Sequence, residues 1–373
     1  MKIESLDLRD FRNYPSLTFV PGEGINILYG DNAQGKTNVL EAICLLGTSR
    51  SHRGAKDKDM IRSGEKEAHL RVNLSGIRGS DRIDMHLRRD GAKGIAINRQ
   101  PVKRAGELLG LLPVVFFSPE DLSIIKSGPQ VRRRFVNTEL CQIDSLYTRS
   151  LSSYSRCLMQ RNKLLRDIAF DGRLLAELDI WDTQLVRYGR ELIKERAGFL
   201  EDLGRIVAKI HAGITQGREE LTLEYEPDTA AEAFSGQLAK ARETDLRYKT
   251  TSVGPHRDDF RVLIGGEDAR VYGSQGQQRS AALSLKLAEI ELLRKAKGEE
   301  PVLLLDDVLS ELDRNRQEML LSRIGRTQTF LTCTGVEDVL TGTAALCESR
   351  VFYVENGTVM PKEGAACKEG SGS

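Results

Sequence analysis

The alternation of apolar and polar positions dominates the first 120 residues. Period-two patterns cover residues 2–8 and 68–74, and short apolar runs occupy residues 16–20, 25–29, 83–87 and 113–118. Such patterns are typical of β-strands. Residues 35–46 differ, because Val39, Ile43 and Leu46 recur there at helical spacing. This part of the chain is predicted to form strands around one helix.

The pattern changes between about residues 132 and 214. Proline disappears, and apolar residues such as Leu158, Leu165, Leu185, Leu192 and Leu203 follow a helical repeat. Helices of about 20 residues or more are expected here, arranged as a helical bundle or an antiparallel pair.

Strand signals return at residues 221–225 and 260–264, followed by an amphipathic helix from Gly276 to about Lys295. Residues 302–305 are continuously apolar, as in buried parallel strands, and residues 329–332 and 351–354 predict two more strands. The tail from Glu363 is rich in Gly, Ser and Lys, and we expect it to be disordered. The fold class is therefore α/β, with one domain split by a helical one.

Composition adds limits to this picture. The 373 residues are enough for two or three structural units, and 55 Lys and Arg against 54 Asp and Glu leave no overall charge that would attract a polyanion. The six cysteines form no CxxC pair, which argues against a disulfide scaffold or a zinc site. There is no apolar leader and no run of about 20 apolar residues, so we expect a soluble, cytoplasmic protein.

Residues 30–37, Gly-Asp-Asn-Ala-Gln-Gly-Lys-Thr, match the pattern of a phosphate-binding P-loop without exception. A strand is predicted before the loop and a helix after it, so that main-chain N–H groups would point at phosphate oxygens. Lys36 would reach the β- and γ-phosphates and Thr37 would ligate Mg²⁺. The candidate nucleotide-binding residues are Gly30, Asp31, Asn32, Ala33, Gln34, Gly35, Lys36, Thr37 and Asn38.

A Walker B strand is predicted at residues 302–307, where four apolar residues precede two aspartates. Asp306 would hold Mg²⁺ or its water at the end of the strand. Asp307 would polarise the attacking water, and with Lys36 it forms our candidate catalytic pair. The alternative for Asp307 is a solvated turn residue.

A polar loop at Ser274, Gln275, Gly276 and Gln277 opens the amphipathic helix. The simpler interpretation is an N-cap. A helix start with Ser and Gly is also a phosphate-binding surface, and a γ-phosphate held by one P-loop does not need a second cradle on the same chain. This loop would then serve the nucleotide of another subunit.

Together these motifs resemble ABC-type ATPase heads and, more closely, the RecF family within the SMC-like group. The resemblance runs nearly end to end. The most diagnostic strings are Ser-Pro-Glu-Asp-Leu at residues 118–122 and Gly-Pro-His-Arg-Asp-Asp at residues 254–259, supported by residues 8–14, 51–53 and 305–313.

The resemblance implies an ABC-type head with an inserted helical lobe. Lobe I would comprise residues 1–125 (Walker A) and 236–362 (signature, Walker B and D-loop), lobe II residues 126–235, and the tail residues 363–373. The family binds ATP with Mg²⁺, forms head-to-tail homodimers, and hydrolyses ATP slowly with DNA stimulation. Ser274, Gly276 and Gln277 would touch the γ-phosphate in trans, and Asp313 would lie in the D-loop. The partners of the family are DNA at single-strand/double-strand junctions, RecO and RecR. With RecO and RecR, the family helps to load RecA at gaps.

Two positions depart from the general ABC pattern. Asp307 replaces the usual glutamate, which fits slow hydrolysis, and Thr332 or Thr334 stands where a switch histidine is expected. No glutamine is found in the segment at residues 117–122, the best counterpart of a Q-loop.

Clusters of basic residues are candidates for DNA phosphate contacts, and Arg50, Arg53, Lys56, Arg132 and Arg133 are the ones we select. A solvated charged face is an equally good interpretation of any one cluster, and at least one residue of 132–134 should form an internal ion pair. Arg12 and Tyr14 could bracket an adenine, although packing of Tyr14 is as good an explanation.

Two other classes of protein fit the sequence less well. A transporter ATPase subunit is disfavoured by the large helical insert, and a nuclease-coupled ATPase by the short chain after the last strand.

Overall fold

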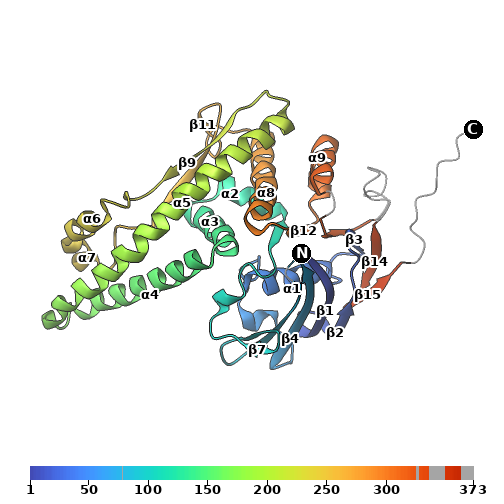
Figure 1. Cartoon of the computed structure of the whole chain (residues 1–373), viewed down its shortest axis with the longest axis horizontal. Coiled ribbons are helices and arrows are strands. Elements are labelled where there is room, and N and C mark those ends of the chain that lie inside the picture. The colour runs from blue at the N-terminus through green and yellow to red at the C-terminus, as the bar shows by residue number, and fades with distance from the viewer. Residues whose placement is uncertain (78, 325–326, 336–348, 363–373) are drawn as a thin grey trace, which may run out of the picture. The chain divides into compact units, whose positions relative to one another are not determined.

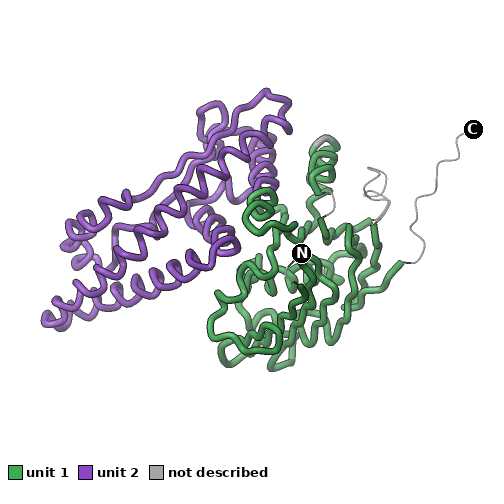
Figure 2. Tube along the Cα trace, viewed as in Figure 1, with its two compact units in different colours: residues 1–121, 289–373 green, residues 122–288 purple. Residues whose placement is uncertain are grey.

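The computed structural model describes residues 1–77, 79–324, 327–335 and 349–362. The chain forms two compact units, one of residues 1–121 with 289–373 and one of residues 122–288 (Figure 2). The lobe boundaries drawn from the sequence remain predictions. The predicted tail lies outside the described residues. Among the described helices, none is long and apolar enough to cross a membrane.

Unit 1 contains two six-stranded sheets (Figure 1). The N-terminal sheet is antiparallel, in the order β2 (Tyr14–Phe19), β1 (Lys2–Phe11), β4 (Glu67–Gly76), β5 (Gly79–Arg88), β6 (Gly94–Ile97) and β7 (Gln100–Pro101). The second sheet runs β15 (Thr358–Pro361), β14 (Arg350–Glu355), β3 (Ile25–Tyr29), β13 (Thr329–Cys333), β12 (Val302–Asp306) and β8 (Val114–Phe117), with only β15 antiparallel to its neighbour. All strands predicted from the sequence for this unit are present.

Helix α1 (Lys36–Thr48) is buried in the core of unit 1. Apolar side chains of α1 form one cluster with the inner faces of both sheets, including Leu70 of β4 and Leu304 of β12. Burying a side chain of this size contributes roughly 1.5–3 kcal/mol, so the helix is fixed mainly by packing. A Cβ added at Gly47 would lie 2.8 Å from the carbonyl oxygen of Leu112, which shows how closely α1 approaches its neighbours.

The remaining elements of unit 1 are short. They are η1 (Asp57–Met60), η2 (Ala105–Glu107), η3 (Pro119–Asp121), η5 (Leu309–Glu311) and α9 (Arg314–Ile324). Helix α8 (Gln275–Lys297) begins in unit 2 and ends in unit 1.

Unit 2 is mainly helical, and its largest feature is the pair formed by α4 (Ser145–Asp167) and α5 (Leu178–Thr215), joined by η4 (Gly172–Glu177). The two helices run side by side in opposite directions (Figure 1), which confirms the predicted antiparallel pair. A three-stranded sheet, β11 (Glu267–Asp268), β10 (Asp259–Ile264) and β9 (Leu221–Glu226), completes the unit with α2 (Leu122–Lys126), α3 (Pro129–Ile143), α6 (Phe234–Lys240) and α7 (Arg242–Tyr248).

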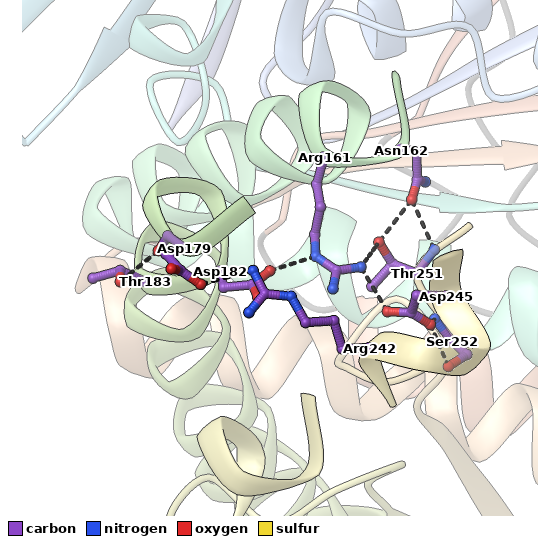
Figure 3. A network of polar contacts seen from close by, with 9 residues as sticks. All are labelled: Arg161, Asn162, Asp179, Asp182, Thr183, Arg242, Asp245, Thr251 and Ser252. Atoms are coloured by element: carbon purple, nitrogen blue, oxygen red, sulfur yellow. Dashed lines mark hydrogen bonds and ion pairs between the residues drawn. The ribbon is translucent and has the colours of Figure 1, made fainter. Parts of the chain in front are cut away.

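A buried arginine ties the helices of unit 2 together (Figure 3). Arg161 on α4 is fully buried, and its guanidinium donates to Asp182 of α5 and to Asp245 of α7, each at 2.6 Å. It also donates to Thr251 at 2.8 Å. A buried charge is tolerated only when it is paired, so this arginine fixes three segments at once.

Four cysteines, Cys44, Cys141, Cys157 and Cys333, are buried. The other two, at positions 347 and 367, lie outside the described residues.

Candidate nucleotide-binding site

The predicted P-loop connects β3 to α1, and its two outer glycines are required by the backbone. Gly30 and Gly35 have φ angles of 147° and 117°, in the region that favours glycine. A Cβ at Gly30 would lie 2.4 Å from the carbonyl oxygen of Val354, and one at Gly35 would lie 2.6 Å from Asn13 Nδ2. A side chain at either position would therefore distort the loop.

Groups distant in sequence hold the loop in place. Asn13, in the turn between β1 and β2, donates to the Gln34 carbonyl at 2.8 Å and accepts from Asn38 Nδ2 at 2.8 Å. From the turn between β14 and β15, the Asn356 N–H donates to Gln34 Oε1 at 2.8 Å. Asn13 and Asn356 were not predicted as supports of the site. The only signal for Asn13 in the sequence was its place in the string at residues 8–14, which supported the family resemblance. No such signal was found for Asn356.

Lys36 lies inside the loop, with 8% of its surface exposed. Its ammonium donates to the carbonyls of Gly30 at 2.5 Å and Asp31 at 2.7 Å. Burial lowers the pKa of Lys36, and the nearby charges of Asp307 and Asp31 partly oppose that shift. The lysine is thus placed where phosphate oxygens could replace the two carbonyls as acceptors.

The two phosphate-site motifs meet through hydrogen bonds between side chains. Thr37 Oγ1 donates to Asp306 Oδ1 at 2.6 Å, and Thr332 Oγ1 donates to the same oxygen at 2.9 Å. The register of β12 and β13 explains the second bond, because Thr332 is paired with Asp306. The Asp307 N–H in turn donates to Thr332 Oγ1 at 3.0 Å. Of the two threonines considered for the switch position, Thr332 is the one that contacts Walker B.

Asp307 is exposed and has a φ angle of 53°. A non-glycine residue in this left-handed region is strained, and such strain concentrates at functional sites. Ser310 Oγ donates to the Asp307 carbonyl at 2.7 Å, which helps to hold the turn.

A buried carboxylate organises the loop after α1. Glu41 on α1 accepts from Arg12 Nε at 2.7 Å, from Arg12 Nη2 at 2.8 Å and from Ser51 Oγ at 2.6 Å. The next residue, His52, stacks on Phe116 of β8 with ring centroids 3.9 Å apart. Burial lowers the pKa of His52 to about 4, so the ring is neutral at pH 7.

Because Ser51 and His52 are anchored in this way, the following residue, Arg53, lies near the Walker B carboxylate. Its Nη2 is 4.0 Å from Asp306 Oδ2. The sequence pattern suggested a DNA contact for Arg53. The structure instead places it beside the candidate phosphate site, because Ser51 is anchored on Glu41 and His52 on Phe116.

A cavity of about 520 Å³ lies beside the P-loop, lined by Asn38 and by Asn13, which holds the loop from the β1–β2 turn. Its lining is strongly basic and consists of Arg12, Asn13, Asn38, Arg53, Lys58, Asp59, Ile61, Ser63 and Arg89. Arg12 therefore borders a space near the loop, as the adenine hypothesis requires. Tyr14 does not, because it is fully buried and donates to the Gly35 carbonyl at 3.1 Å.

The candidate signature lies at the start of α8. Ser274 and Gln277 form a reciprocal capping box, in which the Gln277 N–H donates to Ser274 Oγ at 3.2 Å and the Ser274 N–H donates to Gln277 Oε1 at 2.8 Å. The N-cap interpretation is confirmed, and it is compatible with a ligand because Ser274, Gln275 and Gly276 are exposed. The D-loop candidate Asp313 is also exposed and accepts from the Arg316 N–H at 3.0 Å.

The DNA prediction for Arg132 is wrong. This residue is 5% exposed, and its guanidinium binds both oxygens of Asp259 at 2.6 Å. Arg133 is half-buried and donates to the Asp258 carbonyl at 2.6 Å, so its guanidinium already has an internal acceptor. The internal ion pair expected within residues 132–134 is thereby confirmed. Arg50 and Lys56 are exposed.

The diagnostic string at residues 254–259 has a structural role in unit 2. Asp258 is buried and accepts from Arg196 at 2.8 Å, from Tyr225 at 2.6 Å and from the Asp228 N–H at 2.9 Å. His256 Nδ1 lies 2.7 Å from the Tyr154 hydroxyl. This string therefore belongs to an internal network of hydrogen bonds and ion pairs.

Relatives of the chain are recognisable over almost its whole length. The family model described as the RecF/RecN/SMC N terminal domain matches residues 2–359. A DNA replication and repair protein RecF from Agathobacter rectalis is 53% identical over 359 residues, covering 96% of this chain and 99% of the relative. The RecF of Clostridium perfringens is 42% identical over 365 residues, with the same coverage.

Solved structures agree with these sequence relatives. A recombination mediator protein RecF with ATP, described within the RecFOR pathway, superposes with a TM-score of 0.90 at 38% identity and covers 96% of this chain and 97% of that one. An Smc head bound to the C-winged helix domain of ScpA has a TM-score of 0.56 at 15% identity, which shows the shared fold alone.

The two sheets around α1, with the P-loop after β3 and Walker B at the end of β12 on the other side of β13, define an α/β head of the ABC and SMC type. Within that class the assignment is narrower. The chain belongs to the RecF family of DNA replication and repair proteins.

Proposed function

We propose that this protein is an ATP-dependent switch that acts on DNA in recombinational repair and at replication forks. The observation that carries the proposal is the direct link between Walker A and Walker B, in which the Thr37 and Thr332 hydroxyls both donate to Asp306 Oδ1. Because of this link, a nucleotide that binds at Walker A would also change the hydrogen bonds of Asp306 in Walker B. The solved structure of a RecF with ATP supports ATP as the nucleotide.

In this proposal the main-chain N–H groups of residues 30–38 and the Lys36 ammonium hold the phosphates. The basic cavity beside Asn13 and Asn38 takes the base and ribose, and Arg12 borders them. The Thr37 hydroxyl and the Asp306 carboxylate suit Mg²⁺, because this ion prefers hard oxygen ligands. The Arg53 guanidinium, 4.0 Å from Asp306, adds positive charge near the phosphates.

Hydrolysis is assigned to Asp307, which would orient and polarise water. Its strained φ of 53° and the hydrogen bond from its N–H to Thr332 fix its backbone. Asp307 is one methylene shorter than glutamate, so slow turnover, stimulated by DNA, is the expected behaviour of a switch.

The second half of the site is proposed to come from another copy of the chain, in a head-to-tail dimer. Ser274, Gly276 and Gln277 at the exposed start of α8 would contact the γ-phosphate in trans, with Asp313 at the same interface. Next to the signature, Val271 and Tyr272 are 65% and 71% exposed. Exposed apolar side chains beside a ligand-binding loop fit a surface that is covered on dimerisation.

DNA at single-strand/double-strand junctions, RecO and RecR are the proposed partners, with RecA loading at gaps as the outcome. Membership of the RecF family supports this part of the proposal, together with the solved relative, a recombination mediator of the RecFOR pathway. Arg50 and Lys56, which are exposed, remain the DNA-contact candidates.

The nucleotide proposal is tested with Lys36→Ala. Removing the ammonium should raise the Kd for Mg-ATP at least 100-fold, because the phosphates lose their charged donor. Fluorescent ATP titration of the full chain measures it, and Lys163→Ala, which removes an exposed cation on α4 outside the proposed site, is the control and should leave Kd unchanged. Equal affinity of wild type and Lys36→Ala would reject the proposed site.

A further inference from the structure

The solvent-facing side of the N-terminal sheet carries a cluster that the nucleotide site does not use. Glu67 and His69 lie two residues apart on β4, so their side chains share one face. The antiparallel register places His69 directly opposite His86 of β5. Ala68, which lies between Glu67 and His69, and its cross-strand partner Leu87 point into the core, so the cluster faces outward.

The three side chains converge on one point. His69 Nε2 lies 3.3 Å from Glu67 Oε1, and His86 Nε2 lies 2.8 Å from Glu67 Oε2. One ligand atom from each residue falls within 4.8 Å of the other two. The imidazole rings are stacked, with centroids 4.2 Å apart and an angle of 19° between their planes.

Two imidazoles and a carboxylate form a donor set that Zn²⁺ binds in proteins, with water in the fourth position. The Glu67 oxygens already lie about as far from the imidazole nitrogens as neighbouring ligands lie in a tetrahedral site, on the order of 3.3 Å at Zn–ligand distances near 2.0 Å. Because Glu67 and His69 are exposed and His86 is partly so, the rings can turn toward an ion without disturbing the core.

We propose that Glu67, His69 and His86 form a Zn²⁺ site that cross-links β4 and β5. In the metal-free protein Glu67 bridges the two histidines by hydrogen bonds, and the ion replaces that bridge. The basic neighbour Arg88 weakens the site, because its Nη2 lies 3.5 Å from His86 Nδ1. An ion pair on a solvated sheet surface is the competing explanation, and it predicts no bound metal.

The test uses the full chain, purified with chelator and titrated with Zn²⁺ alone in competition with a zinc-sensitive dye. Wild type should bind one Zn²⁺, and the affinity should fall at least tenfold in His69→Gln and in His86→Gln. Arg88→Gln should bind it about threefold more tightly or better. The matched control is Asp84→Asn, which removes a carboxylate on the same face, paired with Arg71 and Arg82, and should leave the affinity unchanged.

A second readout separates metal binding from damage to the fold. Saturating Zn²⁺ should raise the thermal unfolding midpoint of wild type and of Asp84→Asn by at least 2 °C, and that of the His69→Gln/His86→Gln double variant by less than 0.5 °C. All variants should have the wild-type midpoint in chelator. Equal zinc affinity in wild type and the double variant, or no stoichiometric binding by wild type at 100 μM Zn²⁺, would overturn the proposal.

Discussion

At the scale of single residues, the site depends on hydroxyls and amides as much as on the motif residues themselves. Thr332 is the clearest case, because its hydroxyl donates to Asp306 Oδ1 and accepts from the Asp307 N–H. It thereby joins the carboxylate proposed to hold Mg²⁺ to the residue proposed to promote hydrolysis. Thr332 therefore links β13 to Walker B by hydrogen bonds at the position where ABC-type heads usually carry a histidine.

Thr332→Val should lower the rate of ATP hydrolysis about 10-fold to 100-fold and change the Kd for ATP less than threefold. The substitution keeps the shape and removes a hydroxyl that orients Asp306 and Asp307 rather than the phosphates. Phosphate release measures the rate, and fluorescent ATP titration the affinity.

The matched control lies on the same strand. Thr329 is buried, and within the part of the chain that the structure describes its hydroxyl donates only to the Thr327 carbonyl, at 3.0 Å. Thr329→Val should therefore leave the rate within about twofold. Equal loss of activity in the two variants would assign the effect to β13 packing and not to the Walker B contact.

At the scale of elements, three ion pairs around two buried residues fix the positions of helices, which apolar packing alone would not do. Glu41 on α1 binds Arg12 in unit 1, and Arg161 on α4 binds Asp182 and Asp245 in unit 2 (Figure 3). Each pair joins segments from different parts of the chain, so each selects one packing arrangement.

Arg161→Ala should lower the free energy of unfolding by about 3–5 kcal/mol, because it leaves the buried Asp245 carboxylate without its cation. Urea unfolding followed by circular dichroism measures it. Arg205→Ala is the control, because the Arg205–Asp202 pair on α5 is exposed and should be worth less than about 1 kcal/mol. A similar cost in both variants would show that the buried network does not hold the helices.

At the scale of the whole molecule, the two halves of the proposed ATP site lie in different compact units. The P-loop and Asp306 belong to unit 1, whereas the signature belongs to unit 2. The exposed signature in one chain and the P-loop in another would complete two sites in a head-to-tail pair. In the proposed mechanism, ATP would therefore act by converting the monomer into a dimer.

Ser274→Arg should bind ATP with wild-type affinity yet keep the mass of a monomer when ATP is added, whereas wild type should double its mass. The larger cationic side chain would block the γ-phosphate surface without touching the P-loop. Light scattering with and without ATP and gapped DNA measures this.

Ser152→Arg, an equally large change at an exposed position on α4, should dimerise as wild type does. If Ser274→Arg also dimerised normally, the trans contact would be rejected. If neither variant nor wild type changed mass, the ATP-dependent dimer itself would be rejected.

Much of the fold was predictable because strand and helix periodicities are local. Every predicted strand is present in the described structure, and the antiparallel pair in unit 2 was among the alternatives. The short strands β6, β7, β11 and β15 were not predicted, because they are too short to show a period. The DNA-contact prediction for Arg132 failed, because a run of basic residues has the same sequence pattern whether its side chains face solvent or pair with a residue such as Asp259.

By itself the sequence determined the motif residues, the family and the class of ligand. This was possible because the P-loop motif occupies eight consecutive positions, residues 30–37. Only the tertiary structure decided which groups complete and support the site. Thr332 reaches Asp306 across 26 residues, Arg12 reaches Glu41 across 29, and Asn356 reaches Gln34 across 322. Contacts of that kind leave no local period or motif, because they are set by strand register and by the packing of α1.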